Sequence, residues 1–209
     1  MRVGLFVLVV LEMSIVSTSA LAQVQPERTT AALVLAEGAV YLNDTPVEPA
    51  AAPSVLPGVA VLRTAQGRAA IALKRGGWLF LNADSSVRVL GNAVYNFNRL
   101  EALSGSAIVS SGTSAPLVDC ESKIRLSSGG LFRFDVQPAN AEGERPCRFR
   151  VYDGAAAVPL VTVTNALRAG EAMMCNRRCG DMIPTTEFSP SQLDAFDQWV
   201  RRVQQQLKK

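Results

Sequence analysis

The stretch Leu131–Val136, LFRFDV, decides the fold class of this chain. Its two phenylalanines and its valine alternate with an arginine and an aspartate, and the same alternation recurs in Arg148–Tyr152 (RFRVY) and Lys123–Leu126 (KIRL). A period of two places apolar side chains on one face of a β-strand and charged side chains on the other face, in water. Helical spacing does not account for this pattern, so these stretches predict half-buried β-strands.

Similar short segments continue outward from this stretch, from about Ala32 to Glu171. Turn-forming pairs such as Asn43-Asp44, Gly76-Gly77 and Asp153-Gly154 stand between the apolar segments, where the chain must reverse. Strand starts recur about every 8–12 residues, which is typical of a sandwich, a barrel or a solenoid. The prediction is an all-β fold of stacked short antiparallel strands, in a solenoid-like or jelly-roll-like β module, with a C-terminal α-helix.

The helix is predicted over residues 189–208. Ser189 suits the N-cap, Pro190 the first helical position, and Gln192 completes a capping box. The apolar residues that follow have helical spacing: Leu193, Phe196, Trp199 or Val200, Val203 and Leu207. Such a face must pack on something, and two alternatives stay open: docking onto the β module or binding a partner.

The first 22 residues have the features of a secretory signal peptide. Arg2 supplies the positive charge, Leu5–Leu11 the apolar run, and Ala20-Leu21-Ala22 the cleavage pattern. Glu12 inside the apolar stretch disagrees with this interpretation. The rival interpretation, an uncleaved membrane anchor, is disfavoured because a span needs about 20 apolar residues. The expectation is cleavage near Ala22, a periplasmic or secreted protein, and no transmembrane span in the mature chain.

Charge and cysteine content restrict the function further. The net charge of +3, from 21 basic and 18 acidic residues, is too small to predict nucleic-acid binding. In an exported chain, four cysteines favour disulfides, and we expect the pairs Cys120–Cys147 and Cys175–Cys179. A zinc site formed by four thiolates is the alternative, although the spacing is not that of two CxxC knuckles.

The sequence gives little sign of catalysis. It contains no histidine, the usual general base of hydrolases and the commonest metal ligand. Its carboxylates lie mostly at strand ends and turns, and none is marked as one of a pair. Nucleotide-binding and calcium-binding motifs are absent from the sequence. We therefore expect no catalytic residues, no cofactor and no metal, and a protein that is not an enzyme.

Two pairs of aromatic residues are candidate ligand contacts. Trp78 and Phe80 lie two residues apart, as do Tyr95 and Phe97. Either pair could form a platform for a sugar or a peptide. The alternative is that these side chains belong to the core, where aromatics of β-strands are usually found.

Three longer segments together resemble the FecR domain family. They read LAEGAVYLNDTPV (35–47), LPGVAVLRTAQGRAAIALKRGGWLFLNADSSVRVL (56–90) and LEALSGSAIV (100–109), followed by GGLFRFDV and LRAGEAM. The positions that match the family pattern in the first three segments are Gly38, Val40, Gly58, Thr64, Gly67, Ala70, Leu73, Gly77, Ser86, Val87 and Gly105. The resemblance covers about two-thirds of the chain, from Leu35 to Met173. It implies an all-β extracytoplasmic module.

Well-studied members of that family relay a receptor signal to a sigma factor across a membrane. This chain departs from them, since a signal peptide stands where they carry a cytoplasmic anti-sigma region and a span. The predicted organisation is a signal peptide (1–22), a FecR-like β domain (32–173), a linker with a cysteine loop (174–188) and a helix (189–208).

The expected function is that of a non-catalytic exported envelope protein, a binding or scaffold module in envelope signalling or assembly. Its expected partner is a protein or an envelope polymer. The alternative function is a carbohydrate or cell-wall binder that uses the surface aromatics.

Overall fold

The computed structural model describes residues 31–49, 52–91, 98–159, 164–175 and 185–207. The predicted signal peptide and its cleavage site lie outside the described residues, as do Tyr95, Phe97 and Cys179. Within the described ranges, no helix has the length and hydropathy needed to cross a bilayer.

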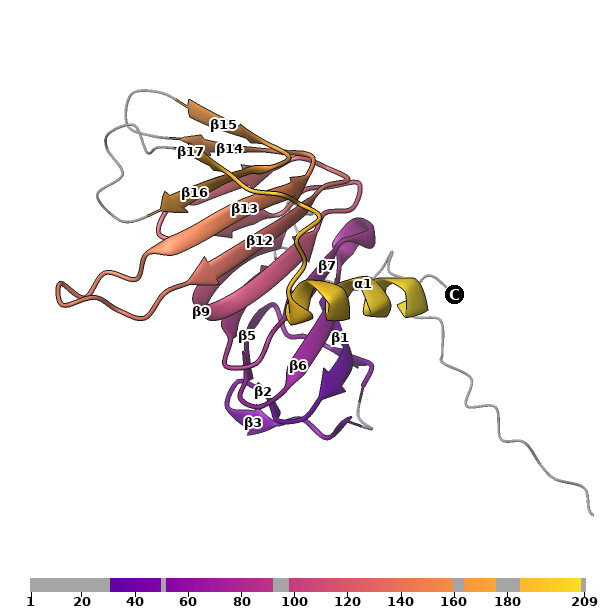
Figure 1. The fold of residues 1–209 in the computed structure, drawn as a ribbon. Coiled ribbons are helices and arrows are strands. Elements are labelled where there is room, and N and C mark those ends of the chain that lie inside the picture. The colour runs from indigo at the N-terminus through magenta and orange to yellow at the C-terminus, as the bar shows by residue number, and fades with distance from the viewer. Residues whose placement is uncertain (1–30, 50–51, 92–97, 160–163, 176–184, 208–209) are drawn as a thin grey trace, which may run out of the picture.

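The strands form two stacked layers that share one long strand (Figure 1). The first layer, sheet A, has the order β4-β1-β6-β7-β9-β12-β13-β16-β17. Its strands are β1 (Ala31–Glu37), β4 (Ser54–Val55), β6 (Arg68–Leu73), β7 (Trp78–Leu81), β9 (Asn98–Ser110), β12 (Leu131–Val136), β13 (Cys147–Asp153), β16 (Glu171–Cys175) and β17 (Thr185–Glu187).

The second layer, sheet B, has the order β3-β2-β5-β8-β9-β10-β11-β14-β15. Besides β9, its strands are β2 (Val40–Leu42), β3 (Thr45–Pro46), β5 (Val59–Thr64), β8 (Ser86–Gly91), β10 (Leu117–Asp119), β11 (Lys123–Leu126), β14 (Ala155–Pro159) and β15 (Thr164–Arg168). The β9–β10 pair is parallel, and the other described pairs are antiparallel. A short 3-10 turn (Lys74–Gly76) connects β6 to β7.

Strand β9 joins the layers because it changes sheets at Gly105. Residues before this point pair with β8 in sheet B, and residues from Gly105 to Ser110 pair with β12 in sheet A. Gly105 has φ +70°, and a Cβ there would collide with the backbone of Asp84 and Ser85. Only glycine meets both demands without strain. The match of this position to the FecR pattern therefore has a structural cause.

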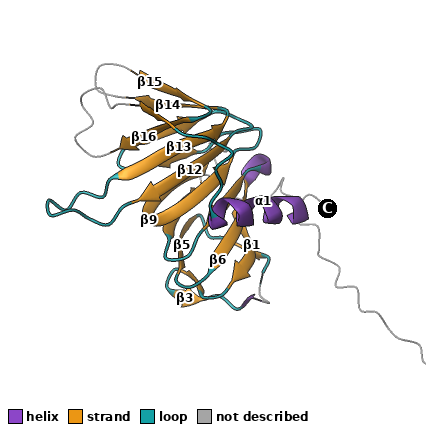
Figure 2. Cartoon of the chain, viewed as in Figure 1, coloured by secondary structure: helices purple, strands orange, loops and turns teal. Residues whose placement is uncertain are grey.

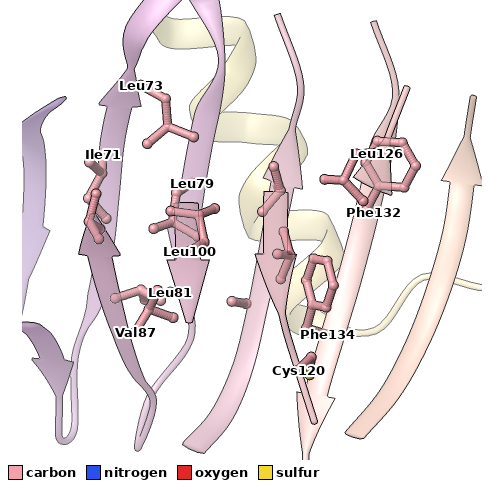
Figure 3. Close-up of a cluster of buried hydrophobic side chains, with 14 of the residues drawn as sticks. Ile71, Leu73, Leu79, Leu81, Val87, Leu100, Cys120, Leu126, Phe132 and Phe134 are labelled. Carbon is pink, nitrogen blue, oxygen red and sulfur yellow. The ribbon is translucent and has the colours of Figure 1, made fainter. Parts of the chain in front are cut away.

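The core lies between the two sheets and consists of alternate residues from both. Figure 3 shows a part of it, with Ile71, Leu79 and Phe134 from sheet A and Val87 and Leu100 on strands of sheet B. The Cys120–Cys147 disulfide crosses this core. It links the end of β10 in sheet B to the start of β13 in sheet A, with a Cα–Cα distance of 5.9 Å. The predicted pairing of these two cysteines is confirmed.

The helix α1 (Ala195–Leu207) lies on the outer side of sheet A (Figures 1 and 2). It begins at Ala195, five residues after the predicted first helical position Pro190, because Asp194 and not Ser189 is its cap. The Asp194 carboxylate accepts hydrogen bonds from the amides of Phe196 and Asp197, both at 2.9 Å, and the Asp197 carboxylate accepts one from the amide of Asp194 at 3.1 Å. This reciprocal arrangement satisfies the free amides at a helix start.

The predicted linker 174–188 contains strand residues toward both of its ends, and residues 176–184 lie outside the described residues. Met174 and Cys175 belong to β16, and Thr185–Glu187 form β17, the last strand of sheet A. The fold class itself is confirmed: the chain is mostly β, in a large, mainly antiparallel arrangement that is not closed, with one C-terminal helix.

Candidate functional site

One row of side chains on the outside of sheet A changes from apolar to charged as it crosses the strands. In register, the row reads Leu35, Ala70, Phe80, Ile108, Arg133, Arg150, Ala172 and Thr186. The apolar residues of the row, together with the neighbouring Trp78 and Leu131, form a surface that we call the covered face. Its members are Leu35, Ala70, Trp78, Phe80, Ile108 and Leu131. The neighbouring charged part begins at Arg133 on β12. The apolar part lies under α1, and the charged part lies beside the start of the helix.

The apolar side of α1 fills the covered face. Phe196, Trp199, Val200 and Val203 are buried there, and the Trp199 ring meets the Phe80 ring edge-on with centroids 6.1 Å apart. The Trp199 indole N–H donates a hydrogen bond to the Glu37 carboxylate at 2.9 Å. Burying a large apolar side chain stabilises a fold by roughly 1.5–3 kcal/mol. The helix is therefore docked as part of the domain, which is the first of the two alternatives left open by the sequence.

Beside the covered face, the charged residues form a compact ionic network, the Arg133 cluster: Arg133, Asp135, Arg150, Tyr152, Asp194 and Asp197. The Arg133 guanidinium pairs with Asp135 at 2.9 Å, Asp194 at 2.6 Å and Asp197 at 3.0 Å. Arg150 pairs with Asp135 at 2.6 Å, and the Tyr152 hydroxyl donates to Asp197 at 3.2 Å. The Arg133 side chain is only 7% exposed, so its charge depends on these partners.

Burial and charge change the pKa values in this cluster. Burial alone would lower the pKa of Arg133, but the charges of Asp135 and Asp197 and its hydrogen bonds to carboxylates outweigh burial and raise it. Burial, with a smaller contribution from Asp197, raises the pKa of Tyr152 to about 12, against the opposing charges of Arg150 and Arg133. Burial raises the pKa of Asp194, but the amides at the helix start and the Arg133 guanidinium outweigh burial and lower it.

Asp194 makes two kinds of interaction, and together they couple the formation of α1 to its packing on sheet A. One of its oxygens caps α1, and the other pairs with Arg133 on the sheet. Asp197 likewise pairs with Arg133 while it bonds the Tyr152 hydroxyl and the Asp194 amide. The first turn of α1 and its attachment to sheet A therefore share the same carboxylates.

This cluster was not predicted from the sequence, because the alternation in LFRFDV predicts that its charged side chains lie in water. That expectation is wrong for Arg133, which is buried, and for Asp135, whose side chain is 13% exposed. A signal was available in the helix: Asp197 stands three residues before Val200, on the apolar stripe. A carboxylate on a buried stripe requires a cation opposite it.

The four aromatic residues predicted as candidate ligand contacts differ in where they lie in the structure. Phe80 is fully buried under α1, so its ring is not available to a ligand, and the core alternative is correct for it. Trp78 is half-buried and packs on Phe80, with ring centroids 6.4 Å apart. Tyr95 and Phe97 lie outside the described residues. Trp78 and Phe80 thus belong to the helix interface.

The remaining cysteine prediction stays a prediction. Cys175 is buried on β16, directly opposite Cys147 of β13 in register. Cys179, its predicted partner, lies outside the described residues. In the described part of the chain, no three histidine, cysteine or acidic residues come together as a metal site.

The outer side of sheet B differs from that of sheet A, because none of the described helices packs on it (Figure 1). We call it the open face and define it by two rows of outward-facing residues. The first row, in register, is Val59, Leu90, Arg99, Leu117 and Arg125. The second row is Val61, Arg88, Glu101, Asp119 and Lys123. Apolar and charged side chains are mixed along both rows.

The charges at the centre of the open face pair with one another. Arg88 meets Glu101 at 2.6 Å, and Arg99 meets Asp119 at 2.7 Å and Glu101 at 3.5 Å. Lys123 and Arg125 are exposed and have no side-chain partner among the described residues. Val59 is 59% exposed, and Val61, Leu90 and Leu117 are half-buried. The open face is thus a sheet surface that exposes apolar side chains and, within the described chain, two cations without an ionic partner.

Comparison with solved structures finds a similar fold in candidate anti-sigma factors from Parabacteroides distasonis. One crystal structure superposes with a TM-score of 0.52 at 15% identity, over 64% of this chain and 62% of that chain. A second gives a TM-score of 0.50 at 15% identity, over 62% and 60%. The chain thus spans about three-fifths of the length of these structures. No family model and no curated relative matches the sequence. At this identity the likeness establishes the fold alone.

Proposed function

We propose that this chain is a non-catalytic, exported binding module of the cell envelope, with a FecR-like domain whose open face docks a protein partner. The observation that carries the proposal is the difference between the outer faces of the two sheets. Sheet A has its apolar surface covered by α1, while sheet B presents apolar and basic side chains to solvent. An uncovered sheet surface that exposes apolar side chains among charged ones has the mixed composition of many interaction surfaces.

The side chains of the open face specify the chemistry of the partner. The apolar side chains of Val59, Leu90 and Leu117 would pack against apolar side chains of the partner. Lys123 and Arg125, at one border of the open face, would pair with carboxylates of the partner. The charges of Arg88 and Arg99 at the centre are already paired with Glu101 and Asp119. The partner is therefore a protein with an apolar patch that carries acidic residues on one side. Complementary charge at the border of an interface sets its orientation and its association rate.

Two observations support the FecR-like family and the compartment. The order of the family's motifs along Leu35–Met173 agrees with the fold likeness to candidate anti-sigma factors. The disulfide between the two sheets agrees with the predicted signal peptide, because disulfides persist in oxidising compartments. The module takes part in envelope signalling or assembly through a partner held on the open face.

Photo-crosslinking in intact cells tests the docking surface. A photoreactive phenylalanine analogue replaces Leu90 or Leu117 on the open face, and Gln205 on the exposed side of α1 serves as the matched control. We expect one discrete adduct from both open-face positions and none from Gln205. Adding Lys123→Glu and Arg125→Glu should abolish the adduct, whereas Arg202→Glu on α1 should not.

Adducts at Gln205 that equal those at the open face would remove the open face as the docking surface. The proposed docking surface would also be excluded if the adduct still formed in the double charge-reversal variant, since the partner would then not pair with Lys123 and Arg125.

Export is tested independently by mass analysis of the purified envelope fraction. The expected product begins at Gln23 and contains the Cys120–Cys147 bridge. A chain that retains Met1, or that carries reduced Cys120 and Cys147 in a cytoplasmic fraction, would exclude the exported location.

The alternative function, cell-wall binding through the aromatics, has less support. Phe80 is buried beneath α1, and Trp78 is half-buried against it. The described residues therefore offer no flat aromatic pair for a sugar ring.

A further inference from the structure

A hollow of about 330 Å³ lies where the C-terminal half of α1 passes over the ends of β9, β12 and β13. Three residues that are adjacent in register line it from the sheet: Ser110, Leu131 and Asp153. Arg201 and Gln204 line it from the helix. The volume falls in the range of sites for small molecules. The hollow shares no residue with the open face.

The walls of the hollow are fixed by hydrogen bonds. The buried Ser111 hydroxyl donates to the Ser127 carbonyl at 2.6 Å and accepts from the Gly130 amide at 2.8 Å, which holds the turn before β12. The Tyr152 ring lines the hollow and is held by its bond to Asp197. A cavity with a preformed frame binds a ligand without the entropic cost of ordering its own walls.

The polar side chains in the hollow have unused hydrogen-bonding capacity. Among the residues that the structure describes, Arg201, Gln204 and Ser110 have no side-chain partner. The Asp153 carboxylate accepts one hydrogen bond, from the Gly154 amide at 2.8 Å, and forms no ion pair within the described chain. A cation and a carboxylate thus line the same hollow without neutralising each other.

We propose that this hollow binds a small polar ligand that presents a carboxylate to Arg201 and hydroxyl or ammonium donors to Asp153. A guanidinium suits a carboxylate because its planar N–H groups match the two oxygens. Gln204 and Ser110 can each donate and accept, so they complete the contacts to a polar ligand. Sugar acids and free amino acids share this chemistry.

The proposal connects ligand binding to α1. One wall belongs to the helix and the other to sheet A, so the hollow exists only while the helix is docked. A ligand that binds the docked form alone must stabilise that form. Both tryptophans of the chain, Trp78 and Trp199, lie in the helix interface, so their fluorescence reports this stabilisation.

Calorimetric titration of the purified mature chain tests the proposal with matched probes. Galacturonate and alanine carry the carboxylate, while galactose and alaninamide lack it. We expect one carboxylate probe to bind at millimolar concentration or below and to raise the unfolding temperature followed by tryptophan fluorescence. Its counterpart without the carboxylate should bind at least about tenfold more weakly, a difference of about 1.4 kcal/mol. The probe that binds assigns the ligand as a sugar acid or an amino acid.

Single substitutions identify the site. Arg201→Gln and Asp153→Asn should each weaken binding of that probe at least about tenfold, while the unfolding temperature without ligand stays near that of the wild type. Arg202→Gln is the control, because Arg202 is the adjacent exposed arginine of the same helix and does not line the hollow. The proposal is overturned if neither carboxylate probe binds at millimolar concentration, or if Arg201→Gln and Arg202→Gln bind the probe equally well.

Discussion

The covered face with its neighbouring Arg133 cluster and the open face both lie on strands that alternate apolar and charged residues, yet the charged residues of the two regions have different roles. On sheet A, the Arg133 side chain is 7% exposed and has three carboxylate partners, of which Asp197 lies on α1 and Asp194 is its cap. On sheet B, the Arg88 side chain is 42% exposed and its main partner is Glu101 on the neighbouring strand. Exposed ion pairs contribute little to stability, whereas removing one member of a buried pair is strongly destabilising.

The difference teaches that alternation in a strand does not determine what lies against its outer side. Asp135 and Arg150 would be ordinary surface residues if α1 were absent. With α1 docked, Asp135 belongs to a network that fixes the position of the helix. Sheet B keeps its outer side chains available, and this is the basis of the proposed docking surface.

The largest change should come from truncating the helix interface. Trp199→Ala removes the ring that packs on Phe80 and bonds Glu37, and we expect it to lower the free energy of unfolding by about 3–5 kcal/mol. Gln205→Ala, on the exposed side of the same helix, should change it by less than about 0.5 kcal/mol. Urea unfolding followed by circular dichroism measures both. Equal effects of the two variants would mean that α1 does not pack on sheet A.

The two arginines give the next comparison. Arg133→Ala leaves Asp135, Asp194 and Asp197 without their shared cation, so it should cost about 3 kcal/mol or more. Arg88→Ala, on the open face, should cost at most about 1 kcal/mol. Thermal unfolding of both variants at the same pH and salt measures the difference. A loss for Arg88→Ala as large as that for Arg133→Ala would contradict the distinction between the faces.

A pair of valine substitutions compares a buried and an exposed position of the two faces. Val200→Ala deletes two carbons from a side chain that is 1% exposed under the covered face, and should cost about 2 kcal/mol. Val59→Ala makes the same change at a residue of the open face that is 59% exposed, and should cost less than about 0.5 kcal/mol. The denaturant midpoints of the two variants decide the matter, and a reversed order would refute the assignment of the faces.

The smallest effect concerns acid pH. The pKa of Asp194 is lowered in the fold, so its stabilising contribution is present above its unfolded pKa of about 3.9 and is lost as the pH falls through the folded value. Asp194→Asn should therefore be less stable than wild type at pH 7 and approach it below about pH 4. Unfolding temperatures measured across this range provide the check. A constant gap between the two proteins at every pH would exclude this role of the carboxylate.

Much of the fold could be predicted from local patterns. The strands β11, β12 and β13 follow the alternation of KIRL, LFRFDV and RFRVY, and the Cys120–Cys147 bridge follows from cysteine count and placement. The apolar stripe of α1 was also visible. Each of these features depends on residues that are close in the sequence or on a small number of pairings.

The site could not be predicted in the same way, because it depends on contacts over long sequence distances. Arg133 and Asp197 are 64 residues apart, and Trp199 and Glu37 are 162 apart. The start of α1 was misplaced because Ser189 and Gln192 fit a capping box as well as Asp194 and Asp197 do. Pairing with Arg133 favours the second pair, and it exists only in the folded chain.

Hydroxyl-radical footprinting of the native chain tests the central claim most directly, because one experiment compares the outer faces of both sheets. Each residue's oxidation rate is divided by its rate in the unfolded chain. We predict that Phe80, Phe196 and Trp199 are strongly protected, while Val59, Leu90 and Leu117 react at a substantial fraction of their unfolded rates. Rapid oxidation of Phe196 and Trp199 in the folded protein, or full protection of Val59, Leu90 and Leu117, would contradict a covered face on sheet A and an open face on sheet B.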